Sequence, residues 1–488
     1  MTLNPEALLI PVLLPFLGGW ILLCLPELSE RKRNIFLEIF ACSTSVTVFA
    51  MLHIIRGRGD AVYSFTKGFS IAFLIDGPAM LFAGMIAFMW PLALLYSFEY
   101  MRGNPRQNQF YAFYLMTYGI TLGVAFSANL VTMYVFFEML TLVTIPLVSY
   151  WSDPDSIYAS RLYIGYCVFG ASLAFIAVVM GTLDGIGDFL YRGNLAGEYD
   201  SDFMRIVYLC GFFGFGTKAA IFPFFEWLPK ASVAPTPVTA LLHAVAVVNA
   251  GGFAVLRLTW YAFGPALLSG SIVHAICVLT ASFSMIFAAV MALRQRHFKR
   301  RLAYSTMSNL SYILFGVALL TPDGLWGGLA HMLFHGVIKM SLFLCAGAFM
   351  RVTGNEYLYE LDGVGRHMPW TFTAYTLGAL SLTGIPLFCG FISKWRLLTA
   401  GIAAGTPAAF IGSVSLIISA FLCALYSLTV SVRAFYPYGG RERCGPDIHE
   451  ANWKMLVPIW IFAAFNIFFG LRSDFIMSFL ESIARGII

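Results

Sequence analysis

Long apolar runs recur along almost the whole chain, and short polar joints separate them. Hydrophobic residues make up 59% of the sequence and charged residues only 11%, against roughly 25% charge in an ordinary soluble domain. Because a helix needs about 20 apolar residues to cross a bilayer, these runs predict an all-α polytopic membrane protein with about fourteen transmembrane helices. The expected spans are 6–26, 34–55, 71–97, 110–128, 130–150, 161–183, 204–222, 235–260, 271–293, 302–320, 325–350, 370–398, 407–435 and 454–471, with a short amphipathic tail at 474–488.

Basic residues in the short joints predict the orientation of the chain, because cytoplasmic loops carry an excess of Lys and Arg. The joints after odd-numbered spans hold most of these residues, as in Arg31–Arg33 and in the stretch 294–301. Arg56 and Arg58 go against the trend, whereas the acidic stretch 184–203 falls on the opposite side. We therefore expect a multi-pass protein of the cell (cytoplasmic) membrane with both termini on the outer side.

Spans 4–8 and 9–13 form two predicted repeats of five helices. An odd number of helices places the second repeat upside down in the membrane relative to the first, as in many ion transporters. The predicted organisation is an N-terminal part at 1–109 (helices 1–3), a first repeat at 110–260, a second inverted repeat at 271–435, and a C-terminal helix with its short tail at 436–488.

Two lysines lie in apolar helices that Pro and Gly interrupt, at matching places in the two repeats. Lys218 stands in GFFGFGTKAAIFPFFEWLP, five residues before Pro223. Lys394 stands in SLTGIPLFCGFISKW, after Gly384 and Pro386. An ammonium at bilayer depth costs at least about 2.5–3.5 kcal/mol, and interrupted helices in corresponding places indicate an ion or substrate site. The pattern predicts movement of protons or Na+, although a lysine that snorkels to the interface is an alternative for Lys218.

Glu138 lies in mid-span, in SANLVTMYVFFEMLTLVTIPLVSYW. An isolated carboxylate at that depth would be protonated, whereas a lysine partner would keep it charged. Lys218 is the natural candidate for this partner. A protonated, hydrogen-bonded structural Glu is the alternative.

A row of titratable residues follows in HMLFHGVIKMSLFLCAGAF. His331, His335 and Lys339 are spaced i, i+4, i+8, which puts them on one helix face over two turns. Since histidine titrates near neutral pH, such a row fits a proton relay better than unrelated core histidines. His243, in TALLHAVAVVNAGG, is a further candidate, with an isolated core histidine as an equal alternative.

The sequence gives no sign of a bound cofactor or metal. The nine cysteines are scattered and none forms a CxxC, whereas an Fe–S cluster or a structural zinc site needs clustered thiolates. No dinucleotide-binding or Walker motif is present. The net charge of +5 is modest and does not indicate a nucleic-acid partner.

Several strings resemble one protein family. GTKAAIFPFFEWLPKASVAPTPVTALLHAVAVV is similar to the signature of the antiporter-like subunits of respiratory complex I, group 4 membrane-bound hydrogenases and Mrp-type Na+/H+ antiporters. HMLFHGVIKMSLFLCAG, GIPLFCGFISKW, RQRHFKRRLAYSTMSNLSYILFG and YSFEYM resemble further blocks of this family, in the family's order. The resemblance implies fourteen helices with two inverted five-helix repeats, each containing a broken helix.

The resemblance also implies site residues. In this family a Glu on helix 5 and a Lys on a broken helix form a switchable ion pair, and a hydrated line of charge crosses the membrane plane. The matching positions in this sequence are Glu138, Lys218, His243, His331, His335, Lys339 and Lys394. Three positions depart from the family pattern: Asn249 replaces a frequent Lys, Phe225 a His and His297 an Asp.

These features together predict a proton- or Na+-translocating, antiporter-like subunit of a complex I-like oxidoreductase or hydrogenase (NADH-, ferredoxin- or hydrogenase-linked). Fe–S, Ni–Fe or flavin groups are expected only in partner subunits. The expected partners are paralogous antiporter-like subunits, small membrane subunits, a peripheral redox arm and lipid. The alternative is a component of a multisubunit Mrp-type Na+/H+ antiporter. A solitary solute symporter would need a pocket for an organic substrate, and a structural scaffold would not maintain so many buried charges.

Overall fold

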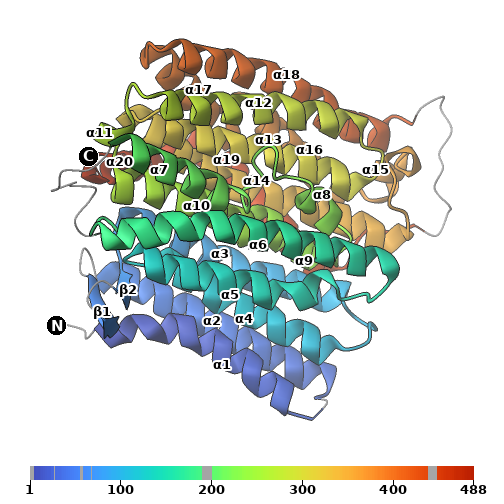
Figure 1. Ribbon diagram of the computed structural model, residues 1–488. Helices are drawn as coiled ribbons and strands as arrows, with labels where there is room; N and C mark the ends of the chain where they lie inside the picture. The colour runs from blue at the N-terminus through green and yellow to red at the C-terminus, as the bar shows by residue number, and fades with distance from the viewer. Residues whose placement is uncertain are drawn as a thin grey trace.

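The computed structural model describes residues 5–26, 28–54, 59–66, 69–189, 201–437 and 448–487. The helices lie side by side in one bundle with their axes roughly aligned, and the chain passes back and forth along this axis (Figure 1). Ten helical segments in these residues are long and apolar enough to cross a membrane, and one of them, Thr236–Phe263, comprises more than one helix. The prediction of an all-α polytopic membrane protein is therefore confirmed.

The N-terminal part contains three long helices and a β-hairpin. Its elements are η1 (Pro5–Leu9), α1 (Ile10–Cys24), α2 (Glu30–Ile54), β1 (Gly59–Thr66), β2 (Phe69–Leu74) and α3 (Gly77–Tyr100). The antiparallel hairpin was not predicted. The backbone amide of Ala128 donates to Ala72 O (3.0 Å), and the Asn129 amide donates to Ser70 O (3.0 Å), so the hairpin is fixed to the start of α5.

The next part of the chain contains the first predicted repeat. Its elements are α4 (Gln107–Phe126), α5 (Leu130–Val148), α6 (Pro154–Leu183), α7 (Ser201–Gly216), α8 (Trp227–Ala231), α9 (Thr236–Ala244), α10 (Val247–Arg257) and η2, a π-helix (Leu258–Phe263). The predicted break after span 7 lies between α7 and α8. The predicted span 235–260 agrees with a candidate membrane span at Thr236–Phe263, but its helix is interrupted at residues 245–246, which was not predicted.

The second predicted repeat contains a corresponding break. Its elements are α11 (Pro265–Leu268), α12 (Ile272–Arg294), α13 (Phe298–Ala318), α14 (Pro322–Thr353), η3 (Leu358–Glu360), α15 (Val364–His367), α16 (Pro369–Thr383), α17 (Cys389–Ala403) and α18 (Pro407–Phe435). Gly384 ends α16 with φ +93°, and Leu387 in the same break has φ +80°. The chain continues with α19 (Trp453–Leu471) and α20 (Ser473–Ile487), which occupies the predicted amphipathic tail.

Four expected spans are not among the ten apolar ones, because they are more polar or are interrupted. They are α4, α7, α13 and the α16–α17 pair. Both predicted repeats have a break in the fourth crossing, and the first repeat has another at residues 245–246 of its fifth crossing. The division of the chain at 109, 260, 271 and 435 stays a prediction.

Two crossings form the centre of the bundle. The apolar stretches of Thr236–Phe263 and of α14 are entirely buried inside the protein. In contrast, α1 and α18 lie at opposite edges of the bundle in Figure 1 and expose large apolar side chains. The outer helices provide the surface that lipid or partner subunits cover, whereas the central crossings exclude both.

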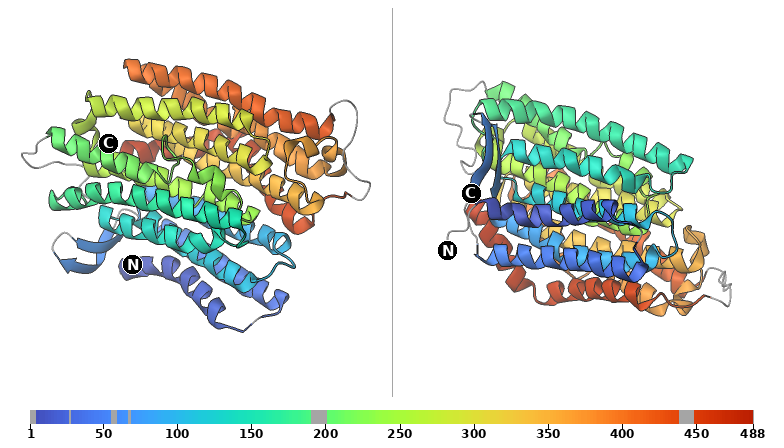
Figure 2. Two further views of the ribbon diagram at one scale, coloured as in Figure 1. Left: turned by 45° about the vertical axis from the view of Figure 1, so that its right-hand side comes forward. Right: turned by 90° about the horizontal axis from the view of Figure 1, so that it is seen from below.

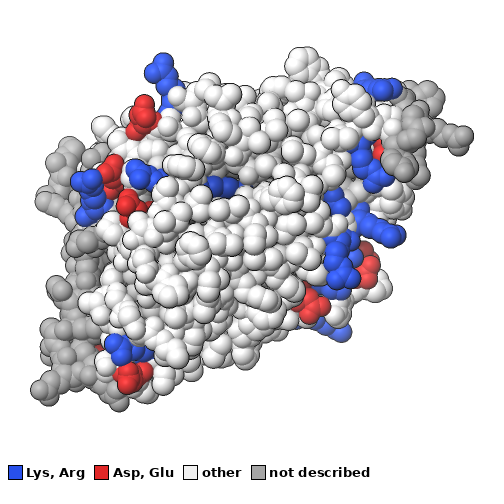
Figure 3. Space-filling view, turned by 90° about the horizontal axis from the view of Figure 1, so that it is seen from above, with Lys and Arg blue, Asp and Glu red and all other residues white. Residues whose placement is uncertain are grey.

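Charged side chains gather at the two ends of the bundle. Figure 3 shows them on either side of a broad band of mostly uncharged residues, as expected for a membrane-spanning surface. The two chain ends lie at the same end of the bundle (Figures 1 and 2). Arg56, Arg58 and most of the acidic stretch 184–203 lie outside the described residues.

Candidate functional site: a buried row of titratable side chains

The turn between α7 and α8 carries Lys218, which is only 1% exposed. Freed backbone groups in this turn have side-chain partners: Trp227 Nε1 donates to Thr217 O (2.9 Å), and Phe222 N–H donates to Ser284 Oγ on α12 (3.1 Å). Non-helical backbone at membrane depth persists only where such partners exist. The break is therefore built into the protein interior, and Lys218 does not snorkel to a bundle end.

Glu138 on α5 is the partner of Lys218, as predicted. Lys218 Nζ lies 3.5 Å from Glu138 Oε1, donates to Phe137 O, and lies 3.6 Å from the centre of the Phe137 ring. The Glu138 side chain is 26% exposed on the outer surface of this chain. The ammonium is thus enclosed, while the carboxylate reaches the face that lipid or a neighbouring subunit covers.

The Lys218–Glu138 geometry predicts energetic coupling. We expect Glu138→Ala and Lys218→Ala each to lower the thermal stability of the complex, because either change leaves an unpaired charge. The double variant should lose less than the sum of the two, with a coupling energy of about 0.5–3 kcal/mol. Thermal unfolding of the four proteins in one detergent tests this, and strict additivity would show that the two groups do not interact.

The unexpected break between α9 and α10 lies next to this pair. Asn249 on α10 donates its amide to Ala244 O, the last carbonyl of α9, at 2.6 Å. A Cβ on Gly251 would lie 2.5 Å from the backbone nitrogen of Ala219, so α10 contacts the Lys218 turn backbone to backbone. His243 is fully buried at the end of α9, and its ring packs on Phe343 of α14 at 4.8 Å.

The predicted row on α14 is present and buried. The rings of His331 and His335 are stacked, with centroids 6.1 Å apart. Lys339 Nζ donates to Leu302 O (3.1 Å) and to Ser305 Oγ, both on α13. The row therefore has a polar partner at its lysine end, and α13 supplies it.

A glycine brings the α9–α10 break close to this row. A Cβ on Gly336, next to His335, would lie 3.0 Å from Ala244 O. Ala244 O is the carbonyl that also accepts from Asn249. The α9–α10 segment thus contacts the α14 row through Ala244 at its break and the Lys218 turn through Gly251 of α10.

Lys394 on α17 is at the far end of the row. Its ammonium donates to two carbonyls at the end of α16, Leu382 O (2.5 Å) and Thr383 O (3.2 Å). His331 Nδ1 lies 2.9 Å from Ser393 Oγ. Because Ser393 directly precedes Lys394 on α17, this contact places Lys394 next to the His331 end of the α14 row. The structure therefore places His243 and Lys394 against α14 and its row, with the Lys218–Glu138 pair next to α10, while the roles of all seven residues stay predictions.

Tyr312 on α13 is a part of this path that sequence reasoning missed. Its ring lies 5.2 Å from the ring of His331 and 5.2 Å from Lys394 Nζ. Its hydroxyl donates to Ser419 Oγ (2.9 Å), which lies 2.8 Å from Ser308 Oγ. A tyrosine among many membrane aromatics gives no sequence signal, because only the fold brings it to the row.

A second missed group is a buried ion pair between Arg257 and Asp76. The Arg257 guanidinium donates two hydrogen bonds of 2.5 and 2.6 Å to Asp76, whose side chain also caps α3 by accepting from Ala79 N–H (3.1 Å). A sequence signal for Arg257 was available, because this charged residue stands in an apolar run just as Lys218 does. This pair fixes the end of α10 to the start of α3.

The family departure at His297 lies at a bundle end, away from the row. His297 Nε2 lies 3.2 Å from Glu356 Oε2, and this contact lowers the pKa of the Glu356 carboxyl. Phe225, the other aromatic departure, packs its ring on Phe287 at 4.9 Å. Neither residue breaks the buried path.

Comparison with known proteins places the chain in one family. Residues 127–422 match the transmembrane family described as NADH:quinone oxidoreductase/Mrp antiporter, and residues 64–111 match the N-terminal family of complex I chain 5 (NADH-ubiquinone oxidoreductase). The first match covers more than half of the chain. The chain belongs to the NADH:quinone oxidoreductase/Mrp antiporter membrane-subunit family.

Curated relatives come from both branches of this family. The chain is 31% identical to the Na(+)/H(+) antiporter A-subunit of Alkalihalophilus pseudofirmus over 83% of its own length and 52% of that protein. It is 30% identical to NADH-quinone oxidoreductase subunit N of Desulforudis audaxviator over 86% of its own length and 87% of that protein. The chain thus spans about half the length of the antiporter protein.

Solved structures share the fold. A chain of the Mrp complex from Dietzia sp. DQ12-45-1b matches with a TM-score of 0.87 at 22% identity, covering 100% of this chain and 98% of that one. A chain of the membrane-bound sulfane sulfur reductase, an archaeal respiratory membrane complex, also matches with a TM-score of 0.87 at 22% identity, with 99% and 98% coverage. The prediction of an antiporter-like membrane subunit is confirmed.

Proposed function

We propose that this chain translocates protons or Na+ as one component of a larger membrane complex. One observation carries the proposal: a buried path of titratable side chains runs from the Lys218–Glu138 pair, past the α9–α10 break, along α14 to Lys394. Intramembrane ionisable groups are costly and mark ion pathways. A protein with a purely structural role does not need three buried lysines and three buried histidines in its centre.

In the proposed mechanism the charge state of the Lys218–Glu138 pair controls the row. While the ion pair is intact, the Glu138 carboxylate keeps the Lys218 amine charged. When Glu138 is neutralised or drawn toward its exposed face, the Lys218 ammonium loses its counter-ion and releases its proton toward the α9–α10 break. His243, His335 and His331 then act as acceptors and donors between Lys218, Lys339 and Lys394.

The driving force comes from partner subunits in this proposal. We favour redox chemistry in a peripheral arm that holds the Fe–S, Ni–Fe or flavin groups, with paralogous antiporter-like and small membrane subunits beside this chain. The sulfane sulfur reductase match, a respiratory complex, supports this version. The second candidate is a multisubunit Na+/H+ antiporter, which the 31% identity to an antiporter protein supports.

The orientation belongs to the same proposal. The end of the bundle that holds Arg31, Arg102, Arg301 and Lys454 is the more basic one among the described residues, which favours the cytoplasm for it. Both chain ends then face outward.

The test of the proposed path is His243→Ala. Its imidazole is the titratable side chain nearest the break on α9, so its removal should interrupt transfer between the two halves. We expect ion translocation to fall about 10²-fold, which is within the contribution of a positioned proton donor or acceptor. Partner redox turnover should stay largely intact. Vesicles with a pH-sensitive dye, assayed beside turnover, measure the two quantities separately.

A second substitution distinguishes a path defect from a packing defect. Asn249→Lys in the His243→Ala background supplies an amine beside Ala244 O and should restore part of the transport. Phe343→Leu, which removes the ring that His243 contacts but no titratable group, is the matched control and should keep transport. Normal pumping in His243→Ala would show that charge bypasses α9.

A further inference from the structure

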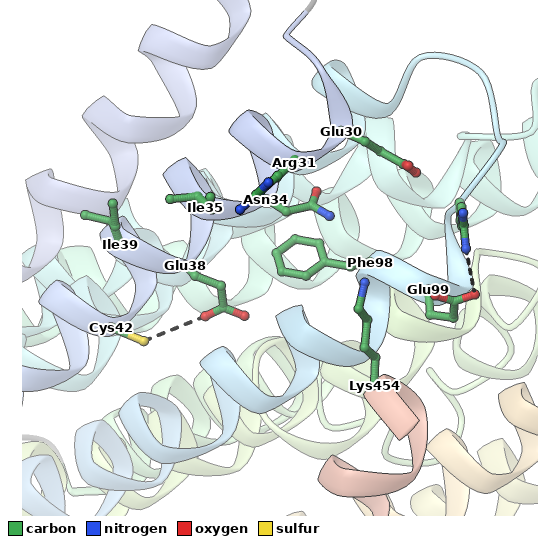
Figure 4. Close-up of a pocket in the computed structure, with 11 residues that line it drawn as sticks. Glu30, Arg31, Asn34, Ile35, Glu38, Ile39, Cys42, Phe98, Glu99 and Lys454 are labelled. Carbon is green, nitrogen blue, oxygen red and sulfur yellow. Dashed lines mark hydrogen bonds and ion pairs between the residues drawn. The ribbon is translucent and has the colours of Figure 1, made fainter. Parts of the chain in front are cut away.

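A groove of about 650 Å³ lies at the basic end of the bundle, away from the buried path. It is formed by the first turns of α2, the end of α3 and the start of α19 (Figure 4). Figure 4 shows the carboxylate of Glu38 and the amine of Lys454 reaching into the same space from α2 and α19. The proposed ion path uses neither residue.

The groove carries both signs of charge in equal number. Three basic and three acidic side chains line it. Only one ion pair forms among them in the described residues, between Arg102 and Glu99 at 3.7 Å. Glu38 accepts only a thiol contact from Cys42 at 3.7 Å, and Lys454 has no ion-pair partner in the described part of the chain. Unpaired cations and carboxylates around one cavity fit a ligand that is itself zwitterionic.

An apolar surface continues from the charged rim toward the membrane interior. Ile35 and Ile39 are 52% and 58% exposed beside the groove. Glu38 lies eight residues after Glu30 on α2, about 12 Å deeper at 1.5 Å per residue. A polar rim above an apolar wall, between membrane helices at a basic bundle end, is the pattern of a lipid headgroup site.

We propose that this groove binds one phospholipid with an amine-bearing zwitterionic headgroup, of the phosphatidylethanolamine class. The phosphodiester oxygens accept hydrogen bonds from Lys454 and Arg31. The headgroup ammonium donates to the carboxylate of Glu30 at the rim, whereas Glu38 lies about 12 Å deeper, beside the acyl chains. The acyl chains pack on Ile35 and Ile39. A phosphatidylglycerol headgroup offers the same phosphate but no ammonium, so it leaves the Glu30 carboxylate unpaired beside a net negative ligand.

Cys42 provides a reporter for occupancy, because its thiol lines the groove and is exposed. Cys24 on α1 is also exposed but is not part of the groove, so it is the internal control. The intact complex is delipidated, reconstituted with phosphatidylethanolamine or with phosphatidylglycerol, and treated with a membrane-permeant maleimide. Peptide mass spectrometry then quantifies labelling at each cysteine. We expect phosphatidylethanolamine to slow labelling of Cys42 about tenfold more than phosphatidylglycerol does, at unchanged labelling of Cys24.

Substitutions separate the two halves of the headgroup site. Lys454→Gln with Arg31→Gln should abolish protection by either lipid, because both share the phosphate. Glu30→Gln should keep protection and shift the preference about tenfold toward phosphatidylglycerol, since a charge-assisted hydrogen bond is typically worth that factor.

Three outcomes would overturn the proposal. Equal protection of Cys42 by both lipids would show that no ammonium is recognised. Protection that survives delipidation would show that a neighbouring subunit covers the groove. Unchanged preference in the Gln variants would show that the named charges do not hold the headgroup.

Discussion

Replacing Lys218 with alanine is expected to stop ion translocation while the complex still assembles. The amine is the group in the α7–α8 turn that can hold and release a proton, and it pairs with Glu138 at 3.5 Å. Because it is fully enclosed, no bulk water can replace it. Translocation should fall about 10²–10⁴-fold, the range for a lost proton-transfer group. Proteoliposomes with a pH-sensitive dye measure this, and native gel mobility reports assembly.

Two further variants make the Lys218 result specific. Lys218→Arg keeps the positive charge but cannot release its proton in a protein, so it should pump as poorly as the alanine variant. Lys230→Ala removes a lysine twelve residues later that contacts the Tyr158 ring at 5.4 Å, outside the path, and should leave pumping intact. Wild-type pumping by Lys218→Ala or Lys218→Arg would remove Lys218 from the mechanism.

Lys339→Ala should have an effect of similar size for a different reason. Lys339 ends the α14 row and donates to Leu302 O and Ser305 Oγ on α13. Without its amine, a proton on His335 has no basic neighbour one turn further along the helix. We expect translocation to fall about 10²-fold or more, while partner turnover continues. Simultaneous dye and turnover assays on one preparation measure the loss of coupling.

Ser341→Ala is the matched control for Lys339. Ser341 is a fully buried polar residue two positions further along α14, and it lies outside the row of His331, His335 and Lys339. Removing the Ser341 hydroxyl tests whether the loss of any polar side chain in the centre of α14 stops pumping. Equal losses in the two variants would indicate a packing effect and would argue against a relay.

Local sequence patterns predicted the fold and the row well because their causes are local. A break near Lys218 follows from the apolar run and Pro223, which cannot continue a helix, although α7 already ends at Gly216 and Lys218 lies within the break. The spacing of His331, His335 and Lys339 fixes one helix face whatever surrounds it. The Lys218–Glu138 contact joins the α7–α8 turn to α5, yet it was predictable, because a buried carboxylate and a buried amine each need a partner.

Other features depend on distant parts of the chain and left no local pattern. The helix break at Val245 and Ala246 contains no Pro or Gly; it is accommodated by the Asn249 amide and the close approach of Gly336. The hairpin forms where Asn129 and Thr132 of α5 bond to it. Tyr312 gains its place only when α13 packs against α14 and α17.

The Gly251 contact has a mechanical consequence. Most neighbouring helices touch through side chains, which can rotate and absorb a displacement. Here the middle of α10, at Gly251, meets the Lys218 turn through main-chain atoms, and the C-terminal end of α10 is held to α3 by the doubly bonded Arg257–Asp76 pair. A helix that is attached at two points transmits a displacement from one attachment point to the other. Any rearrangement of the turn would therefore push or pull on α3 and, through it, on α1 and α2 beyond the predicted repeats.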